Sequence, residues 1–149
     1  MRIDDIDVFC IEPKVRPDIP DYPAALSALH QRVVFKVTLN NGIVGYGEYR
    51  TYAPDKSALE PLIGRNPFDF IGHDLGIGMS QWCLGLSAAL YDAMGKHLEI
   101  PAYKLMGTKV RDRVAVAAWT RPSPPDVLSR EVQRAVDMGY GLMKMHTCH

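Results

Sequence analysis

Two titratable side chains near the C-terminal end of the sequence have the types and spacing that acid–base chemistry needs. Lys144 and His146 are two residues apart in the run 142–148, so in a β-strand both side chains point to the same side. A lysine with a lowered pKa can act as a base or stabilise negative charge, and histidine titrates near neutrality. In a β/α barrel, the strand ends carry the catalytic residues. We therefore predict catalytic roles for Lys144 and His146, against the alternative of an edge strand whose polar side faces water.

The last four residues, 146–149, include types that can bind zinc, namely His146, Cys148 and His149. The two histidines would point to opposite sides of an extended strand, and a closed zinc site needs four convergent ligands. We therefore predict no metal ligands in this sequence.

A strand–helix–strand unit over residues 113–148 is predicted to position Lys144. Residues 113–120 form a nearly continuous apolar run, which is typical of a strand buried on both faces of a parallel sheet. Residues 123–126 have the cap, proline and acidic residue of a helix start, and Gly139 ends that helix. The run that carries Lys144 is then the second strand, parallel to the first.

Antiparallel strands are predicted in the first part of the sequence. Apolar residues recur in 3–11 and alternate with polar ones in 33–39, and extended character resumes over 43–49. Between the last two runs, Asn40-Asn41-Gly42 supplies residues that tolerate positive φ, which indicates a hairpin.

A long loop and one helix complete this first part. Residues 12–30 contain four prolines, which exclude a regular helix or a central strand. A helix over about 82–98 is indicated by apolar residues that recur every four positions, with Pro101 closely behind it. The recurring residues are Leu86, Leu90, Met94 and Leu98.

Composition excludes several classes of partner. The 149 residues contain 17 lysines and arginines against 17 aspartates and glutamates, so no net positive field exists for nucleic acid or an anionic membrane. No apolar stretch has the roughly 18 residues of a membrane span. The three cysteines are scattered, which favours reduced thiols, and we predict a soluble cytoplasmic protein.

A two-stranded parallel sheet has two open edges and too little area to cover its apolar faces. The unit over 113–148 is therefore not expected to be stable alone. We predict that the chain is a fragment of a longer protein, or that it needs a partner.

Several motifs, in the same order along the chain, resemble the mandelate racemase and muconate-lactonising group of the enolase superfamily. Residues 32–48 look like the hairpin of that group's capping domain. Residues 88–107 are similar to its helix and the Pro-x-x-x-Leu-x-Gly turn that follows. Residues 139–146 fall where the family carries the Lys-x-Lys strand of its barrel.

The resemblance implies an α+β capping domain over residues 1–110, with an antiparallel sheet plus helices, followed over 111–149 by the first βαβ unit of a TIM-type (β/α) barrel. In this family a magnesium ion held by carboxylates stabilises the enediolate that forms when the proton next to a carboxylate is removed. The Mg²⁺ ligands lie on later barrel strands, so we expect them outside this chain, which alone would be inactive. Lys144 matches the first lysine, which helps to hold the substrate carboxylate. His146 replaces the second lysine, often the base, so either this imidazole or a group elsewhere in the barrel takes the proton.

In the family, substrate choice comes largely from two cap loops. Arg16 and Tyr22 lie in the first loop of this sequence, and Arg50 and Tyr52 follow the hairpin. Their cations and hydroxyls suit a polyhydroxy carboxylate such as a sugar acid. We predict these four residues as substrate-binding. Structural roles are expected for Glu48 and Asp92, and a core position for Trp82 and Trp119.

The predicted function is a portion of a magnesium-dependent acid-sugar dehydratase, a lyase that forms a homo-oligomer at full length and takes a small-molecule carboxylate. One alternative is an isomerase of the same family, either a racemase or epimerase or a cycloisomerase. The other is a truncated, non-catalytic remnant that acts as an interaction module.

Overall fold

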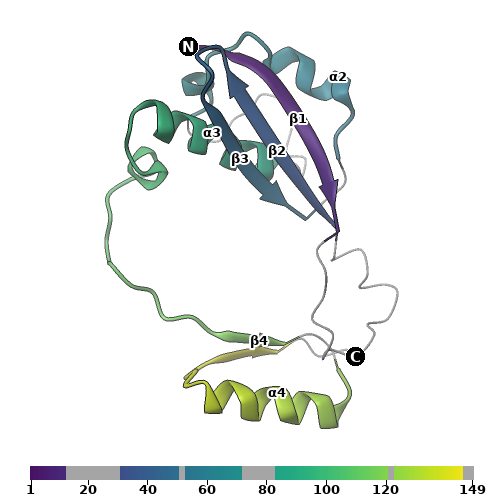
Figure 1. Ribbon diagram of the computed structural model, residues 1–149. Coiled ribbons are helices and arrows are strands. Elements are labelled where there is room, and N and C mark those ends of the chain that lie inside the picture. Colours follow the sequence, from purple (N-terminus) through teal and green to yellow (C-terminus); the bar gives the residue numbers. More distant parts are fainter. Residues whose placement is uncertain (13–30, 51–52, 72–82, 121–122, 146–149) are drawn as a thin grey trace. The chain divides into compact units, whose positions relative to one another are not determined.

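The computed structural model describes residues 1–12, 31–50, 53–71, 83–120 and 123–145 (Figure 1). The chain divides into two compact units, residues 1–109 and residues 110–149. No helix within the described ranges is long and apolar enough to cross a membrane.

A three-stranded antiparallel sheet forms the centre of the first unit (Figure 1). Its order is β1 (Ile3–Ile11), β2 (Arg32–Leu39) and β3 (Val44–Tyr49). The predicted hairpin is confirmed: Leu39 and Gly42 close the turn with backbone hydrogen bonds, and Gly42 has φ +83°. Glycine takes this conformation without the steric cost of a side chain.

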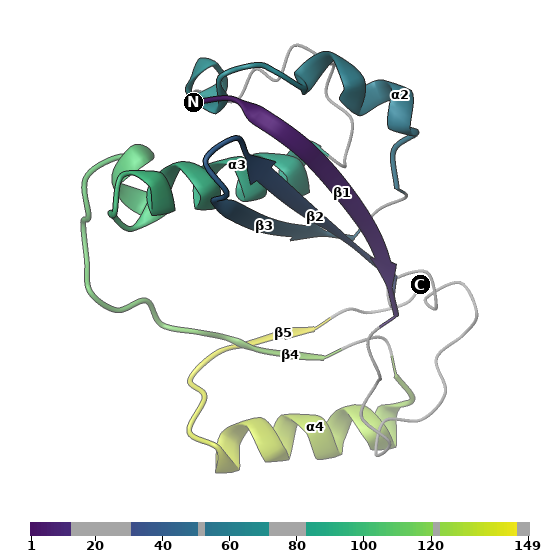
Figure 2. The ribbon, with the colours of Figure 1, turned by 45° about the horizontal axis from the view of Figure 1, so that its top comes forward.

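Helix α3 (Cys83–His97) covers one face of this sheet (Figure 2). Every second residue of β2 is buried, including Phe35 and Val37, and these side chains share the core with Leu86, Leu90 and Met94 of α3. The predicted helix is thus confirmed to within one residue at each end. Its last predicted apolar position, Leu98, is 44% exposed because the helix ends before it.

The backbones of strand β3 and helix α3 lie against each other with no room for a side chain at two glycines of the strand. A Cβ at Gly45 would lie 2.1 Å from the carbonyl oxygen of Ala89, and one at Gly47 would lie 2.0 Å from that of Gly85. Neither strand glycine has a positive φ, so space rather than backbone conformation requires glycine there. The two glycines therefore set the depth at which the helix packs on the strand.

The C-terminus of α3 adopts a glycine-type cap without a glycine. Glu99 has φ +55°, the amide of Ile100 donates to the carbonyl of Gly95, and the amide of Glu99 donates to that of Lys96. These two bonds are the Schellman pattern, which satisfies carbonyls left free at a helix end. A glutamate in this left-handed backbone conformation lowers the stability by about 1 kcal/mol relative to glycine.

Short helices complete the first unit, and the sequence did not predict those before α3. They are α2 (Lys56–Leu59), η1 (Glu60–Leu62), η2 (Pro67–Phe70) and, after α3, η3 (Ala102–Leu105). Leu59, Leu62 and Phe70 extend the core beside the sheet. Such one-turn elements are too short to show a periodic pattern in sequence.

The second unit contains β4 (Ala118–Thr120), α4 (Pro125–Asp137) and β5 (Met143–Met145), with the two strands parallel as predicted. The prediction of a strand over 113–120 buried on both faces is wrong. Only its last three residues are a strand, and Val114 and Val116 are 69% and 71% exposed. Among the described residues β4 pairs only with β5, so the rest of the run has no neighbouring strand to bury it.

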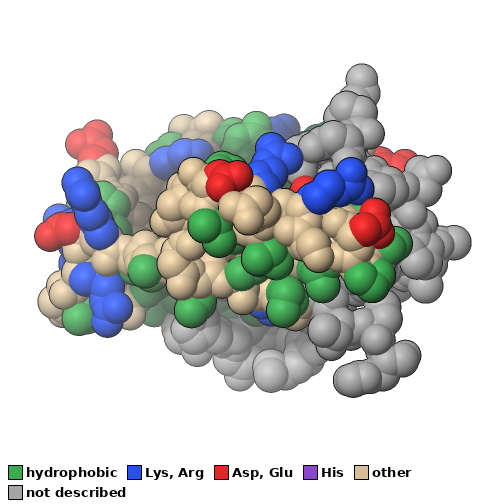
Figure 3. Space-filling model, turned by 90° about the horizontal axis from the view of Figure 1, so that it is seen from below, with side chains coloured by type: hydrophobic (Ala, Val, Ile, Leu, Met, Phe, Trp, Pro, Cys, Tyr) green, Lys and Arg blue, Asp and Glu red, His purple; other side chains and the backbone are tan. Residues whose placement is uncertain are grey.

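Helix α4 keeps much of its apolar surface open. Ala135 is buried, whereas Val136 is 60% exposed. Figure 3 shows hydrophobic side chains between basic and acidic ones on the face that carries α4. The apolar residues of this helix are therefore only partly covered within the unit.

Candidate functional site

Lys144 lies in the middle of β5, at the register position of Trp119 on β4. The amide of Ala118 donates to the carbonyl of Leu142 at 2.9 Å and extends the strand pairing by one bond. Helix α4 covers one side of the strand pair (Figure 2), where Thr120 is 5% exposed. Lys144 and Trp119 are next to Met143 and Thr120 along their strands, so their side chains point to the opposite side. Both Lys144 and Trp119 are exposed.

Arg50 is the second predicted site residue that the structure describes. It is exposed and directly follows β3 in the first unit. Lys144 belongs to the second unit. The other predicted site residues, His146, Arg16, Tyr22 and Tyr52, lie outside the described residues, as do Cys148, His149 and Trp82.

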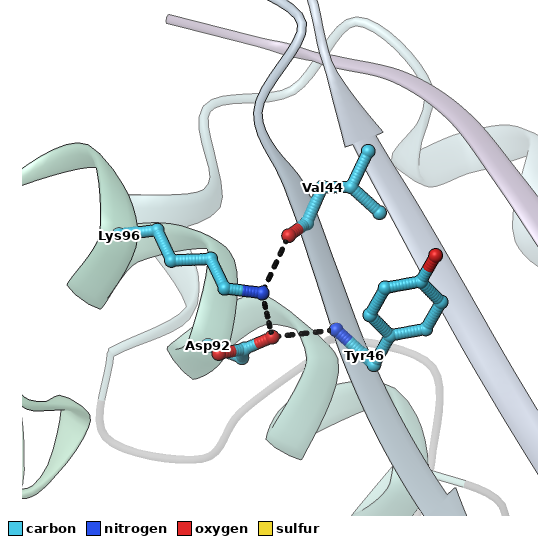
Figure 4. A network of polar contacts seen from close by, with 4 residues as sticks. All are labelled: Val44, Tyr46, Asp92 and Lys96. Carbon is cyan, nitrogen blue, oxygen red and sulfur yellow. Dashed lines mark hydrogen bonds and ion pairs between the residues drawn. The ribbon is translucent and has the colours of Figure 1, made fainter.

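The strand that leads to Arg50 is fixed to α3 by a polar network (Figure 4). Asp92 Oδ2 accepts the backbone N–H of Tyr46 at 2.8 Å, and Lys96 Nζ donates to Asp92 Oδ2 at 2.7 Å and to the carbonyl of Val44 at 2.9 Å. Lys96 Nζ also lies 5.6 Å from the centre of the Tyr46 ring. The structural role predicted for Asp92 is confirmed.

Two further ion pairs lie on the sheet face opposite α3. Glu48 pairs with Arg32 at 2.9 Å, which confirms its predicted structural role. Lys36 donates to Asp7 at 2.8 Å, and this hydrogen bond with the carboxylate charge raises the pKa of Lys36 above 10.5. Each pair joins adjacent strands, so both contribute to the register rather than to chemistry.

Within the described ranges, no three histidine, cysteine, aspartate or glutamate side chains converge to hold a metal ion. The carboxylates described above are instead engaged in ion pairs and backbone hydrogen bonds. Magnesium prefers several oxygen ligands in octahedral geometry, so the described residues do not fit a magnesium site.

Trp119, the register partner of Lys144, lies outside the core. It was predicted in the core, but it is 49% exposed on the same side of the strand pair as Lys144. The useful signal was its place at the end of the first apolar run, because parallel strands bring their carboxyl ends to the same edge.

The sheet-and-helix unit followed by a strand–helix–strand unit is also found in known enzymes. No family model matches the chain. The chain is 30% identical to D-galactonate dehydratase of Variovorax paradoxus (strain S110), over 76% of this chain and 34% of that protein. It is 28% identical to N-succinyl-L-Arg/Lys racemase of Bacillus cereus, over 76% of this chain and 36% of the racemase.

Solved structures show the same fold. Muconate lactonizing enzyme from Pseudomonas putida matches with a TM-score of 0.70 and 24% identity, covering 97% of this chain and 44% of the enzyme. The dipeptide epimerase of Enterococcus faecalis, complexed with Mg and the dipeptide L-Leu-L-Tyr, matches with a TM-score of 0.74 and 20% identity. That match covers 100% of this chain and 46% of the epimerase.

The first unit, an antiparallel sheet packed on helices, is the kind of structure expected of a capping domain. The chain belongs to the mandelate racemase and muconate-lactonising group of the enolase superfamily. It spans about a third of the length of the curated relatives it matches.

Proposed function

We propose that the chain is part of a magnesium-dependent enzyme that removes a proton next to a carboxylate, and that the enzyme is an acid-sugar dehydratase. The observation that carries this proposal is the 30% identity to a D-galactonate dehydratase across 76% of the chain. Two further dehydratases of the same name, from other bacteria, match at 28% and 30% identity.

Residues 1–110 are proposed as the capping domain and residues 111–149 as the beginning of the barrel. Lys144 has the features that its role requires, because it is exposed on the side of β5 away from α4. An exposed ammonium group at this position can donate to a substrate carboxylate. His146 is proposed as the base, with a group elsewhere in the full-length barrel as the alternative.

The polar loops are proposed to choose the substrate. Arg16 and Tyr22 in the first loop, and Arg50 and Tyr52 after β3, would donate hydrogen bonds to the hydroxyls of a sugar acid. Arg50 extends from a strand that the Asp92 and Lys96 network holds in place, which supports a fixed starting point for the second loop.

Magnesium is proposed as the cofactor of the full-length enzyme, with ligands outside this chain. A metal ion supplies charge that neutralises a developing oxyanion. A cytoplasmic location and assembly into a homo-oligomer are part of the same proposal.

The first test is to read the encoding DNA beyond His149 and to express the longer polypeptide. The proposal expects a continuing frame that completes a barrel of about 250 residues. The purified protein is then screened with sugar acids, D-galactonate among them, with Mg²⁺ or with excess EDTA. The expected product is an α-keto acid, formed by loss of water and detected as its semicarbazone.

Two substitutions make the test specific for the proposed site. Lys144→Gln is expected to lower kcat/KM by about a hundredfold or more, because it removes a cationic partner of the substrate carboxylate. Lys104→Gln, at an exposed lysine of η3, is the matched control and is expected to leave kcat/KM unchanged.

The other outcomes identify the alternatives. Exchange of the α-proton with D₂O without loss of water would indicate a racemase or epimerase instead of a dehydratase. A stop codon directly after His149, with a folded and inactive chain, would refute the enzyme proposal and favour a non-catalytic interaction module.

A further inference from the structure

The residue paired with Lys144 on the neighbouring strand has an exposed indole side chain. Trp119 pairs with Lys144 in the parallel register, and Ala118 and Thr120 pair with Met143 and Met145 on either side. Paired residues on adjacent strands point to the same side of a sheet. Trp119 and Lys144 therefore emerge side by side from the second unit.

Burial supports this assignment of sides. Thr120 is 5% exposed and Ala118 is half-buried, whereas Trp119 between them is 49% exposed. Ala135 of α4 is buried as well. Along β4, one side is thus packed within the unit and the other presents the indole, while on β5 both Lys144 and Met145 are exposed.

The two groups suit different parts of one ligand. Adjacent strands lie about 4.8 Å apart, so a molecule held by the ammonium group also reaches the indole. An ammonium group binds a carboxylate, while an indole offers a flat apolar surface with a negative face. The carbon chain of a sugar acid carries C–H bonds along its length, and those bonds can pack on such a surface while its hydroxyls point away.

We propose that Trp119 is a specificity-determining residue, which forms an aromatic wall for the carbon chain of a carboxylate held by Lys144. This inference rests on the proposed function, because it assigns the substrate carboxylate to Lys144. It predicts a preference for extended polyhydroxy acids over short carboxylates that cannot reach the indole.

Substitutions in the longer polypeptide, with Mg²⁺ and the sugar acid that is turned over fastest, test this role. Trp119→Leu is expected to raise KM about tenfold and to leave kcat within about threefold, because it removes an aromatic contact made before and during the reaction. Trp119→Phe keeps a smaller ring, so its KM should rise only about threefold, and it also serves if the leucine variant does not fold. Tyr140→Leu, at another exposed aromatic residue of the second unit, is the control and should keep both constants.

The outcomes separate this inference from the proposed function. An active wild type with an unchanged KM in Trp119→Leu would overturn the inference and leave the function intact. If Trp119→Leu and Trp119→Phe both lower kcat and the melting temperature, and do so to the same extent, the indole is a packing residue. That result would also overturn the inference. If the wild type turns over no carboxylate, the proposed function fails and the inference fails with it.

Discussion

Gly47→Ala is expected to destabilise the first unit much more than a glycine-to-alanine change normally does. The new Cβ would lie 2.0 Å from the carbonyl oxygen of Gly85 and 2.5 Å from the amide nitrogen of Ala89. Both atoms belong to the backbone of α3, so no side chain can rotate away. Strand and helix would have to separate by about 1.4 Å, the difference between 2.0 Å and the 3.4 Å at which ordinary contact begins.

That separation would loosen the contacts of Phe35 and Leu86, which lie in the core between sheet and helix. Overpacking of a filled core costs roughly 1–3 kcal/mol. We expect about 3 kcal/mol here, at the upper end, because the clash is between backbones.

Urea unfolding followed by circular dichroism measures the effect, with Gly42→Ala as the matched control. Nothing lies within 4 Å of a Cβ at Gly42, but its φ of +83° would make alanine cost about 1 kcal/mol. Gly47→Ala should therefore lower the unfolding free energy about three times as much as the control. Equal losses in the two variants would refute the packing argument, since only Gly47 lacks space.

Three further changes test other features of the first unit, each by urea unfolding. Glu99→Gly should raise the unfolding free energy by about 1 kcal/mol, because glycine adopts φ +55° without strain, and an unchanged stability would contradict this. Asp92→Ala should lower it by about 1.5 kcal/mol, because the Tyr46 amide loses its charged acceptor, whereas Asp92→Asn keeps an acceptor and should lose less. The raised pKa of Lys36 stabilises the fold fully below the ordinary lysine pKa of 10.5, so the advantage of wild type over Lys36→Gln should shrink as pH rises through the folded-state pKa. An advantage that grows over that pH range would show that Asp7 is not the cause.

Local pattern predicted the parts of the fold that pack within the first unit. The alternation in β2 and the four-residue period of α3 are direct results of burial against each other, as Phe35 and Leu90 illustrate. Val114 and Val116 show the limit of that reasoning, because burial on both faces of a strand needs neighbours that no local pattern supplies. Glu99 is a different case. Glycine is preferred at the position with positive φ that follows a helix, but in this chain a glutamate occupies that position.

The alternation of side chains along a strand was enough to place Lys144 on the opposite side from Met143 and Met145. The register of β5 with β4 is consistent with that alternation. The same alternation could not identify Trp119 as the neighbour of Lys144. The run around Trp119 is almost entirely apolar, so no polar–apolar pattern distinguishes its two sides. The register between the two strands was needed, and register depends on contacts between residues distant in sequence.

The Asp92 and Lys96 network also bears on aggregation. In the described sheet β3 has a neighbouring strand only on one side, and an unpaired strand edge can template the addition of strands from other molecules. Here the N–H of Tyr46 and the carbonyl of Val44, two groups that an incoming strand would need, are already bonded to side chains one helical turn apart. The two side chains thus occupy part of this edge without contributing a strand, and a copy of the chain that added a strand at β3 would first have to displace both bonds.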